Sequence, residues 1–496
     1  MRRTHPAEDR VAAVVESVVA LVAVPAAALV ADRALRAAVR VRLVLRVTVV
    51  DLDRQVEGVP VDPARLAVLG VEAEGDMVAL PHAHEDREAR DPRASPSVMQ
   101  DLRYPGLDGT VRLEDAGEVL AALKALMTGW QPKVTIRRGI PKAPESLVSS
   151  IRRSGNRMDL HSPWLDEPLR GLRVASAACG VVADISQAFC NQHRDCIGLH
   201  CGAVQINGQL VVLTGPARAG KSTLISRLTA ETDMIVFCDD ILPVLDDGLA
   251  FGLGLAPRLR LPLPENASAA FRAHVATYLG PADNRYGYLC GPNIAPHGTR
   301  APVRAFIMLA RRDQGPASLH HMGAAEAVQH LVRQNISASS EGTGQFDRVT
   351  QMAESLACLK LVYSDLEDAV ALLRQAFGVA GRDASGVDIG PALPATLEPV
   401  THAPARLDQC FRRSQHVAVR AVDADLFLWH ATEHSYFHLN RVARAVWTLL
   451  EEPVSGQEIA DILCEGFPET PRAVIEADVA ALLGAFAAEL LMLPED

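Results

Sequence analysis

The first hundred residues contain no lysine, asparagine, isoleucine, phenylalanine, tyrosine, tryptophan or cysteine. They are mostly valine, alanine, arginine, leucine, aspartate and glutamate, and a packed core without one aromatic ring is unusual. We therefore interpret residues 1–98 as a biased, poorly specified helical extension; if the start codon has been placed too far upstream, Met77 or Met99 would be the natural start. An interaction arm is the alternative. From Met99 onward the composition is ordinary, with Tyr104 and Trp130 among the first aromatic residues.

Excess positive charge and an uninterrupted hydrophobic run are also lacking. The formal net charge is −11, whereas a general nucleic-acid binder needs a basic surface, so we expect no nucleic-acid partner. The apolar stretch Val11–Ala31 is long enough to span a bilayer, but it carries Glu16 and Pro25. We favour a soluble helix pair over a membrane span there.

The cysteines do not form a recognisable framework. The chain has nine, an odd number, and no secretory leader is visible, which indicates reduced thiols and a cytoplasmic protein. One cluster, "CNQHRDCIGLHC", places five zinc-ligand residue types close together, but it lacks a second pair of ligands at zinc-knuckle spacing. We favour buried, inert thiols over zinc for its members, Cys190, His193, Cys196, His200 and Cys201.

Length and local patterns predict several units along the 496 residues. Residues 99–165 form a small α+β lead-in, in which a strand, an amphipathic helix and a second strand make one layer. Residues 166–378 alternate between helix and strand signals, as an α/β domain does. Residues 379–406 are rich in Gly, Pro, Ala and Thr and are predicted to be a linker. Residues 407–496 form a compact last unit of three strands and three helices.

The stretch "LTGPARAGKST", from Leu213 to Thr223, fits the phosphate-binding pattern G-x-x-x-x-G-K-[ST]. It follows an apolar strand and opens a helix, so backbone N–H groups can surround phosphate oxygens. Lys221 would neutralise the β and γ phosphates of ATP, and Ser222 would place its hydroxyl on Mg²⁺. The predicted nucleotide-binding residues are Gly215, Ala217, Arg218, Ala219, Gly220, Lys221, Ser222 and Thr223.

Two adjacent carboxylates end the strand that follows this helix, in "FCDD". In a doubly wound sheet the two strand ends would point to the same edge, where ligands bind. One of Asp239 and Asp240 would hold Mg²⁺, and the other would accept a proton from an attacking hydroxyl. Adjacent carboxylates raise each other's pKa, which suits a base. The later pair Asp246-Asp247 precedes a glycine and is interpreted as a plain turn.

Together these residues resemble the bacterial HPr serine kinase/phosphorylase group, a P-loop fold akin to phosphoenolpyruvate carboxykinase. The resemblance covers about residues 166–378 and rests on "LHCGAVQINGQLVVLTGPARAGKSTL" followed by "FCDD". It implies that His200 matches the family's histidine, that Asp239 is the proton acceptor and that Asp240 supports the metal. The family usually has a glycine where Ala217 or Ala219 stands. We interpret Arg258 and Arg260 as surface charges, with contact to the transferred phosphoryl group as the alternative.

The last unit resembles the PqqD group of small winged-helix-like domains, through "SYFHLNRVARAVWTLLEEPVSGQEIADIL" and "DVAALLGAFAAELLML". Such domains recognise the leader segments of ribosomally made peptides. The resemblance implies that a leader adds as a strand to the edge Ser435–Leu439, beside a helix near Val474 to Leu490. Strand alternation puts Tyr436 and His438 on the opposite face from Phe437, and we expect only one face to be core.

The sequence thus predicts an ATP- and Mg²⁺-dependent kinase that phosphorylates a Ser or Thr hydroxyl of a recruited precursor peptide. Asp239, His200 and Lys221 are the expected catalytic residues, and Ser222 and Asp240 the expected metal ligands. Two alternatives remain. One is a peptide-binding module in which the nucleotide only changes the shape, and the other is a small-molecule or carboxykinase-like enzyme regulated by its last unit. A homo-oligomer is left open.

Overall fold

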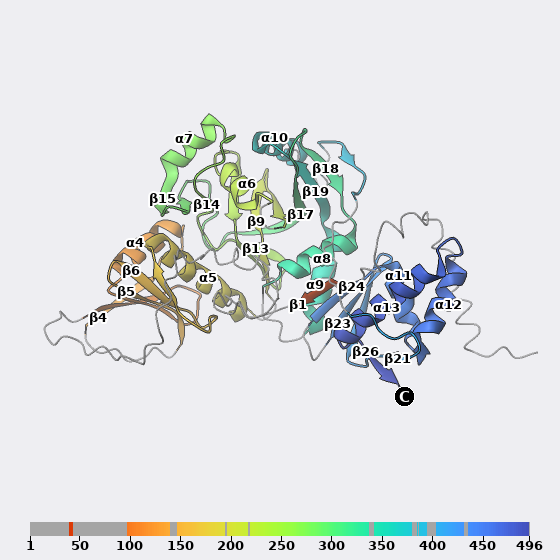
Figure 1. Cartoon of the computed structure of the whole chain (residues 1–496). Coiled ribbons are helices and arrows are strands. Elements are labelled where there is room, and N and C mark those ends of the chain that lie inside the picture. The colour runs from red at the N-terminus through yellow and green to blue at the C-terminus, as the bar shows by residue number, and fades with distance from the viewer. Residues whose placement is uncertain are drawn as a thin grey trace, which may run out of the picture.

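The computed structural model describes residues 39–42, 97–138, 146–193, 196–216, 219–336, 342–378, 384, 386–393, 403–430 and 435–495 (Figure 1). The described part of the N-terminal extension is one strand, β1 (Val39–Arg42). The predicted helical extension is therefore wrong at these four residues. The stretch Val11–Ala31 lies outside the described residues, and so do Ala217 and Arg218.

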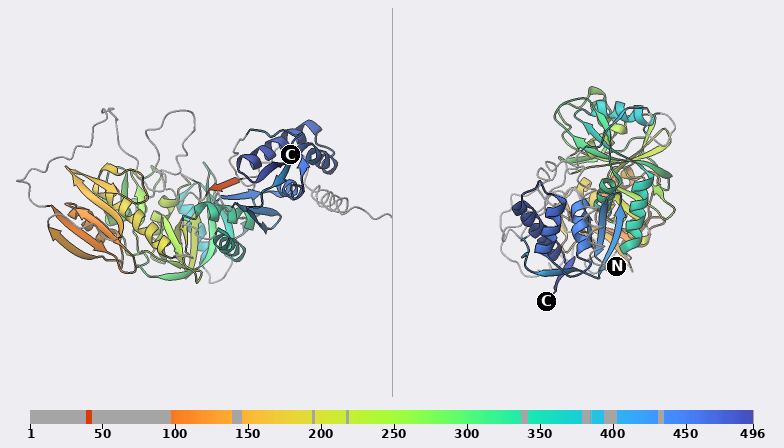
Figure 2. Two further views of the ribbon diagram at one scale, coloured as in Figure 1. Left: turned by 90° about the horizontal axis from the view of Figure 1, so that it is seen from below. Right: turned by 90° about the vertical axis from the view of Figure 1, so that its right-hand side faces the viewer.

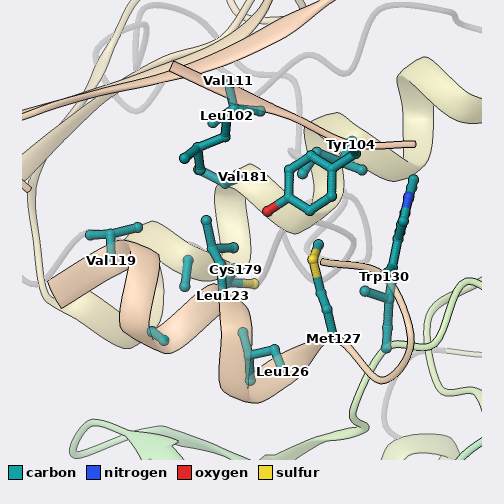
Figure 3. Close-up of a cluster of buried hydrophobic side chains, with 14 of the residues drawn as sticks. Leu102, Tyr104, Val111, Val119, Leu123, Leu126, Met127, Trp130, Cys179 and Val181 are labelled. Atoms are coloured by element: carbon teal, nitrogen blue, oxygen red, sulfur yellow. The ribbon is translucent and has the colours of Figure 1, made fainter. Parts of the chain in front are cut away.

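The lead-in is a six-stranded sheet with two helices on it, larger than the predicted layer of three elements. The strand order is β4-β2-β3-β5-β6-β7, and β7 lies beyond residue 165. Its core holds Tyr104 and Trp130, whose ring centroids are 5.3 Å apart in an edge arrangement (Figure 3). The elements are β2 (Val98–Arg103), β3 (Thr110–Glu114), α4 (Gly117–Leu126), β4 (Lys133–Arg138), β5 (Leu147–Ser154), β6 (Arg157–His161), β7 (Leu169–Leu172) and α5 (Val174–Gln192).

A ten-stranded mixed sheet forms the centre of the molecule. Its main path runs β11-β9-β10-β17-β13-β12-β8, and β19, β18 and β20 continue from β17. The strands are β8 (Ile197–His200), β9 (Gly202–Ile206), β10 (Gln209–Thr214), β11 (Met234–Cys238), β12 (Ile241–Val244), β13 (Leu249–Phe251), β17 (Arg300–Arg311), β18 (Ser318–His321), β19 (Ala357–Tyr363) and β20 (Ile389–Gly390).

The directions of these strands explain how the predicted site is assembled. Asn207 and Gly208 both have positive φ, as a tight hairpin turn requires, and they make β9 antiparallel to β10. Strand β11 is also antiparallel to β9. Strands β10 and β11 therefore run in the same direction with β9 between them, and their carboxyl ends meet at one edge. The sequence predicted this shared edge from a doubly wound arrangement, and in the structure an antiparallel strand, β9, lies between the two strands that form it.

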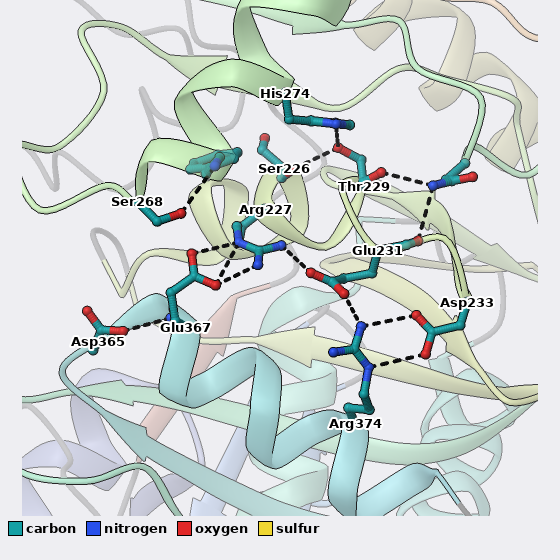
Figure 4. A network of polar contacts seen from close by, with 12 residues as sticks. Ser226, Arg227, Thr229, Glu231, Asp233, Ser268, His274, Asp365, Glu367 and Arg374 are labelled. Atoms are coloured by element: carbon teal, nitrogen blue, oxygen red, sulfur yellow. Dashed lines mark hydrogen bonds and ion pairs between the residues drawn. The ribbon is translucent and has the colours of Figure 1, made fainter.

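Four helices accompany this sheet: α6 (Lys221–Leu228), α8 (Ala324–Gln334), α9 (Gly342–Ser355) and α10 (Leu366–Phe377). A polar network ties α6 to α10, because Arg227 donates to Glu367 at 2.5–3.1 Å and also contacts Glu231 (Figure 4). Arg374 on α10 extends the network to Glu231 and Asp233. These charged contacts hold the helix that follows the predicted phosphate loop.

A small three-stranded sheet with one helix lies next to α6 (Figure 1). It consists of β14 (Arg258–Arg260), α7 (Ala269–Tyr278), β15 (Leu279–Ala282) and β16 (Tyr286–Leu289). Leu259, Phe271 and Leu289 form its core. Strands β15 and β16 pair antiparallel with each other.

The C-terminal unit has two small sheets and three helices. The four-stranded sheet has the order β1-β24-β23-β22, and the three-stranded sheet has the order β25-β21-β26. The elements after β1 are β21 (Cys410–Arg413), β22 (Val417–Val422), β23 (Asp425–His430), β24 (Ser435–Leu439), α11 (Arg441–Leu449), β25 (Val454–Ser455), α12 (Gly456–Gly466), α13 (Arg472–Ala488) and β26 (Met492–Glu495).

Side chains on both faces of β23 and β24 are buried, so the expectation of a single core face was wrong. Leu428 and Phe437 pack with the helices α11–α13. Phe427 and Trp429 face the other way and join the core of α8 and α9, where Phe427 lies 5.4 Å from Phe346 between ring centroids. The C-terminal unit is therefore packed against the central domain (Figure 2). Part of the predicted linker is also a strand of the central sheet, because β20 pairs in parallel with β18.

Candidate functional site

The predicted phosphate loop leaves the buried strand β10 and ends at the first residue of α6. Gly220 has a φ of +90°, and a Cβ atom built there would lie 2.4 Å from the hydroxyl oxygen of Tyr363. A side chain at this position would be strained and would also collide with its neighbour. The loop conformation at Gly220 therefore requires glycine, as the phosphate-binding pattern predicts.

Tyr363 supports this loop from the end of β19. Its hydroxyl donates a hydrogen bond to the backbone carbonyl of Ala219 at 2.7 Å. Burial raises the pKa of Tyr363 to about 12, so the hydroxyl keeps its proton and stays a donor. Sequence reasoning missed this residue, because 144 positions separate it from Ala219 and no local pattern marks it.

Lys221 and Asp240 both contact the side chain of His200. The Nζ of Lys221 lies 3.1 Å from Nε2 of His200, and Oδ1 of Asp240 lies 3.1 Å from the same nitrogen. The side chains of His200 and Asp240 are 21% and 30% exposed, so these groups are partly buried but still reached by solvent. Three residues predicted from separate motifs are thus brought together.

Burial and neighbouring charges determine the protonation states of Lys221, His200 and Asp240. Burial is the main cause that lowers the pKa of both Lys221 and His200, and the Lys221 charge lowers that of His200 further. For Asp240 burial acts upward, but the His200 hydrogen bond and nearby positive charges outweigh it and lower the pKa. We conclude that Asp240 is ionised and that His200 is neutral at neutral pH.

Asp239 has the opposite behaviour. Burial and the neighbouring charge of Asp240 raise its pKa to about 7, against smaller opposing effects of Arg258 and Lys221. Its Oδ2 accepts a hydrogen bond from the backbone N–H of Arg258 at 2.9 Å, which fixes the carboxylate. A carboxylate with a pKa near 7 can accept a proton at neutral pH. Of the two adjacent aspartates, Asp239 has the character of a base and Asp240 that of a permanent anion.

Arg258 belongs to this cluster, so its interpretation as a surface charge was wrong. Its Nη1 donates to the thiol of Cys179 at 2.8 Å, and its guanidinium carbon lies 5.1 Å from the ring centroid of Tyr286. The guanidinium influences the pKa values of Asp239, Asp240 and His200. Arg260, two residues along β14, is exposed.

The donor set suits a nucleotide with a magnesium ion. Ser222 and Thr223 stand in the first turn of α6 and are partly buried. The hydroxyl of Ser222 and the carboxylate of Asp240 are oxygen ligands, which Mg²⁺ prefers. The amine of Lys221 and the amides at the start of α6 would meet phosphate oxygens. Among the described residues no group of three or more His, Cys, Asp and Glu side chains could hold a metal ion.

The second predicted site is the edge strand β24. It pairs with β23 on one side, and on the other side it accepts β1 as an antiparallel strand. His438 on β24 lies 2.8 Å from Asp425 on β23. The predicted edge Ser435–Leu439 thus accepts an added strand, and in the structure β1 of the same chain occupies it. No helix in the described part of the chain is long and apolar enough to cross a membrane.

Comparison with known proteins bears on the C-terminal unit. No curated protein matches the chain. It is similar to a solved structure described as "TbiB1 in Complex with the TbiA(beta) Leader Peptide", with 31% identity over 16% of this chain and 93% of that chain, and with a TM-score of 0.16. Residues 426–491 match the family model described as Coenzyme PQQ synthesis protein D (PqqD), so the chain carries a PqqD domain near its C-terminal end.

Proposed function

We propose that the chain is an ATP-dependent kinase that phosphorylates a Ser or Thr hydroxyl of a ribosomally made precursor peptide held by its PqqD domain. The observation that supports this most is the convergence of Lys221, His200 and Asp240 beside Asp239 at the end of the phosphate loop. This arrangement joins a site for phosphate groups to a carboxylate of basic character.

The proposed step is an in-line transfer. The peptide hydroxyl oxygen forms a bond to the γ-phosphorus of ATP, and the bond from that phosphorus to the bridging oxygen breaks, which releases ADP. Asp239 takes the hydroxyl proton. Lys221 and Arg258 offset the negative charge on the phosphoryl oxygens. Ser222 and Asp240 would hold a magnesium ion, which supplies charge neutralisation on the phosphates when it is bound.

The packing of the PqqD domain supports delivery of the peptide from a fixed position, and not from a flexible tether. Its β23 residues Phe427 and Trp429 share a core with α8 and α9. Ile336, just beyond the end of α8, donates its backbone N–H to Gly198 of β8 at 2.8 Å, and β8 ends at His200. The proposed peptide-binding domain and the proposed catalytic histidine are thus linked through one helix.

The test is a mass measurement on a candidate precursor peptide after incubation with the full chain and ATP·Mg²⁺. Wild type should add one phosphate, and Asp239→Asn should lower the rate by a factor of about 10² to 10⁴, as loss of a general base does. Asp246→Asn is the matched control, because Asp246 is exposed in the turn after β12. Unchanged transfer by Asp239→Asn would remove the role of this residue, and peptide binding without transfer by wild type would favour a binding module.

A further inference from the structure

The chain fills its own strand-accepting edge. Residues 39–42 form β1, which pairs antiparallel with β24 so that Val39 lies opposite His438 and Arg42 lies opposite Ser435. The other side of β24 is occupied by β23 over its whole length. Figure 1 shows β1 beside β24, and the left view of Figure 2 shows the same red strand next to the blue C-terminal unit. Neither side of β24 is therefore free to receive another strand.

The strand slot beside β24 is bordered by a second domain. The Cα atoms of β1 lie within 8 Å of those of α8, a helix of the central domain. A strand in this slot thus lies next to both the PqqD domain and the central domain. Ile336, just beyond the end of α8, is also hydrogen-bonded to β8, the strand that carries His200.

We infer that this slot is a peptide site shared by the two domains, and that residues 39–42 occupy it until an extended peptide displaces them. The inference deepens the proposed function, because the displacing peptide would be the leader of the substrate. A leader that enters the slot would lie between β24 and α8. It would therefore contact the central domain, which also contains the predicted phosphate loop.

Physical chemistry defines the kind of peptide that fits. Strand addition depends mainly on main-chain hydrogen bonds, and a given edge can be used only once. The occupant is a Val-Arg-Val-Arg segment, whose β-branched valines favour the extended conformation. Because it belongs to the same chain, its effective concentration can reach the millimolar range. The competing peptide must therefore be an extended segment that binds more tightly or is present in excess.

Hydrogen exchange on the full-length protein tests the occupancy. Two consecutive prolines, Arg40→Pro with Val41→Pro, remove the N–H groups of neighbouring residues, so one of them must have faced β24. The control is Arg46→Pro with Val47→Pro, a substitution of the same two residue types outside β1. We expect amide exchange in Ser435–Leu439 to become at least tenfold faster in the first variant and to stay unchanged in the control. No change in the first variant, or an equal change in both, would overturn the occupancy.

A synthetic peptide of residues 35–46 then tests whether the slot is shared. The Arg40→Pro/Val41→Pro variant should bind this peptide at least tenfold more tightly than wild type does, with renewed protection of both β24 and α8. Equal binding by the two proteins, no binding by the variant, or protection of β24 without α8 would overturn the inference. The experiment contains no nucleotide. The peptide also has no Ser or Thr, so its binding does not depend on phosphoryl transfer. A precursor peptide that gains no phosphate from the full chain and ATP·Mg²⁺ would refute the kinase proposal and leave the shared slot standing.

Discussion

The Nε2 atom of His200 lies 3.1 Å from Nζ of Lys221, and the same nitrogen lies 3.1 Å from Oδ1 of Asp240. One ring nitrogen cannot satisfy both neighbours, since it either accepts a hydrogen bond from the amine or donates one to the carboxylate. A triphosphate would compete for Lys221, and a magnesium ion would compete for Asp240. His200 therefore contacts two groups that the proposed reaction needs, but it hydrogen-bonds only one of them at a time.

The rate of phosphoryl transfer should rise with pH through neutrality. The pKa of Asp239 is raised to about 7, and only the ionised carboxylate can accept the proton of the attacking hydroxyl. We expect kcat/KM of wild type to increase between pH 6 and pH 8 and then to level off, in a pH–rate series with ATP·Mg²⁺ at fixed excess. A residual rate in Asp239→Asn should lose this rise, and an identical rise in both proteins would assign it to another group.

The raised pKa of Asp239 also affects the stability of the fold: the rate should rise with pH, but the free energy of unfolding should fall. The folded protein keeps the Asp239 proton up to about pH 7, whereas the unfolded chain loses it near the ordinary value of 3.8. The free energy of unfolding that Asp239 contributes should therefore fall as pH rises from 4 to 7. Relative to wild type, Asp239→Asn should melt at an increasingly higher temperature over this range, by calorimetry. A gap that narrows as the pH rises would contradict the assigned shift.

Removal of the Tyr363 hydroxyl should weaken nucleotide binding without unfolding the domain. Tyr363→Phe deletes the donor to the carbonyl of Ala219, a loss of about 1 kcal/mol, or roughly fivefold in the Kd for ATP·Mg²⁺. Tyr104→Phe is the matched control, since the buried hydroxyl of Tyr104 has no hydrogen-bond partner in the described structure. Titration calorimetry should show the loss only in the first variant. Equal affinities would mean that the loop keeps its shape unaided.

Arg258→Gln should slow transfer by a factor of about a hundred or more, as loss of a positive charge on transferring phosphoryl groups does. The backbone N–H that holds Asp239 remains in this variant, so the change isolates the guanidinium. Because Arg258 lowers the pKa of Asp239, the rise in rate should also move to higher pH. Arg260→Gln, at the exposed position on the same strand, should leave both unchanged. Similar losses in the two variants would argue for a general effect of β14.

The contact between domains should be visible in unfolding. Phe427→Ala removes a side chain that is 3% exposed and packs against Phe346, at a cost of about 3–5 kcal/mol. Val419→Ala, at an exposed position of β22, should cost about 0.5 kcal/mol or less. Denaturant titration measures both. Truncation after residue 400 should likewise destabilise the central domain, because it uncovers α8 and α9. A truncated chain as stable as the full one would show that the domains are independent.

Local signals predicted local structure well. Asp365 caps α10 by accepting from the backbone N–H groups of Glu367 and Asp368, and Ser455 forms a capping box with Glu458, whose spacing of three residues is the sequence pattern of a helix start. Each of these patterns depends on residues within a few positions of each other, so the sequence alone contains the information.

Long-range relationships were the part that the sequence could not supply. The hydrogen-bonded residues Tyr363 and Ala219 are 144 positions apart in the sequence, and Arg258 and Cys179 are 79 positions apart. Phe427 and Phe437 pack in two different cores, and strand alternation alone does not indicate the second core. The self-pairing of Val39 with His438 joins the two ends of the chain, and no periodicity indicates it.

Titration calorimetry of the full-length protein with ATP·Mg²⁺ tests the central claim most directly, with wild type and Lys221→Ala compared at one salt concentration. The account predicts one binding site in wild type and an affinity at least a hundredfold lower in the variant, since the amine beside His200 would contact the phosphates. Equal affinities in the two proteins, or no binding heat from wild type over a range of temperatures, would contradict a nucleotide site at the phosphate loop.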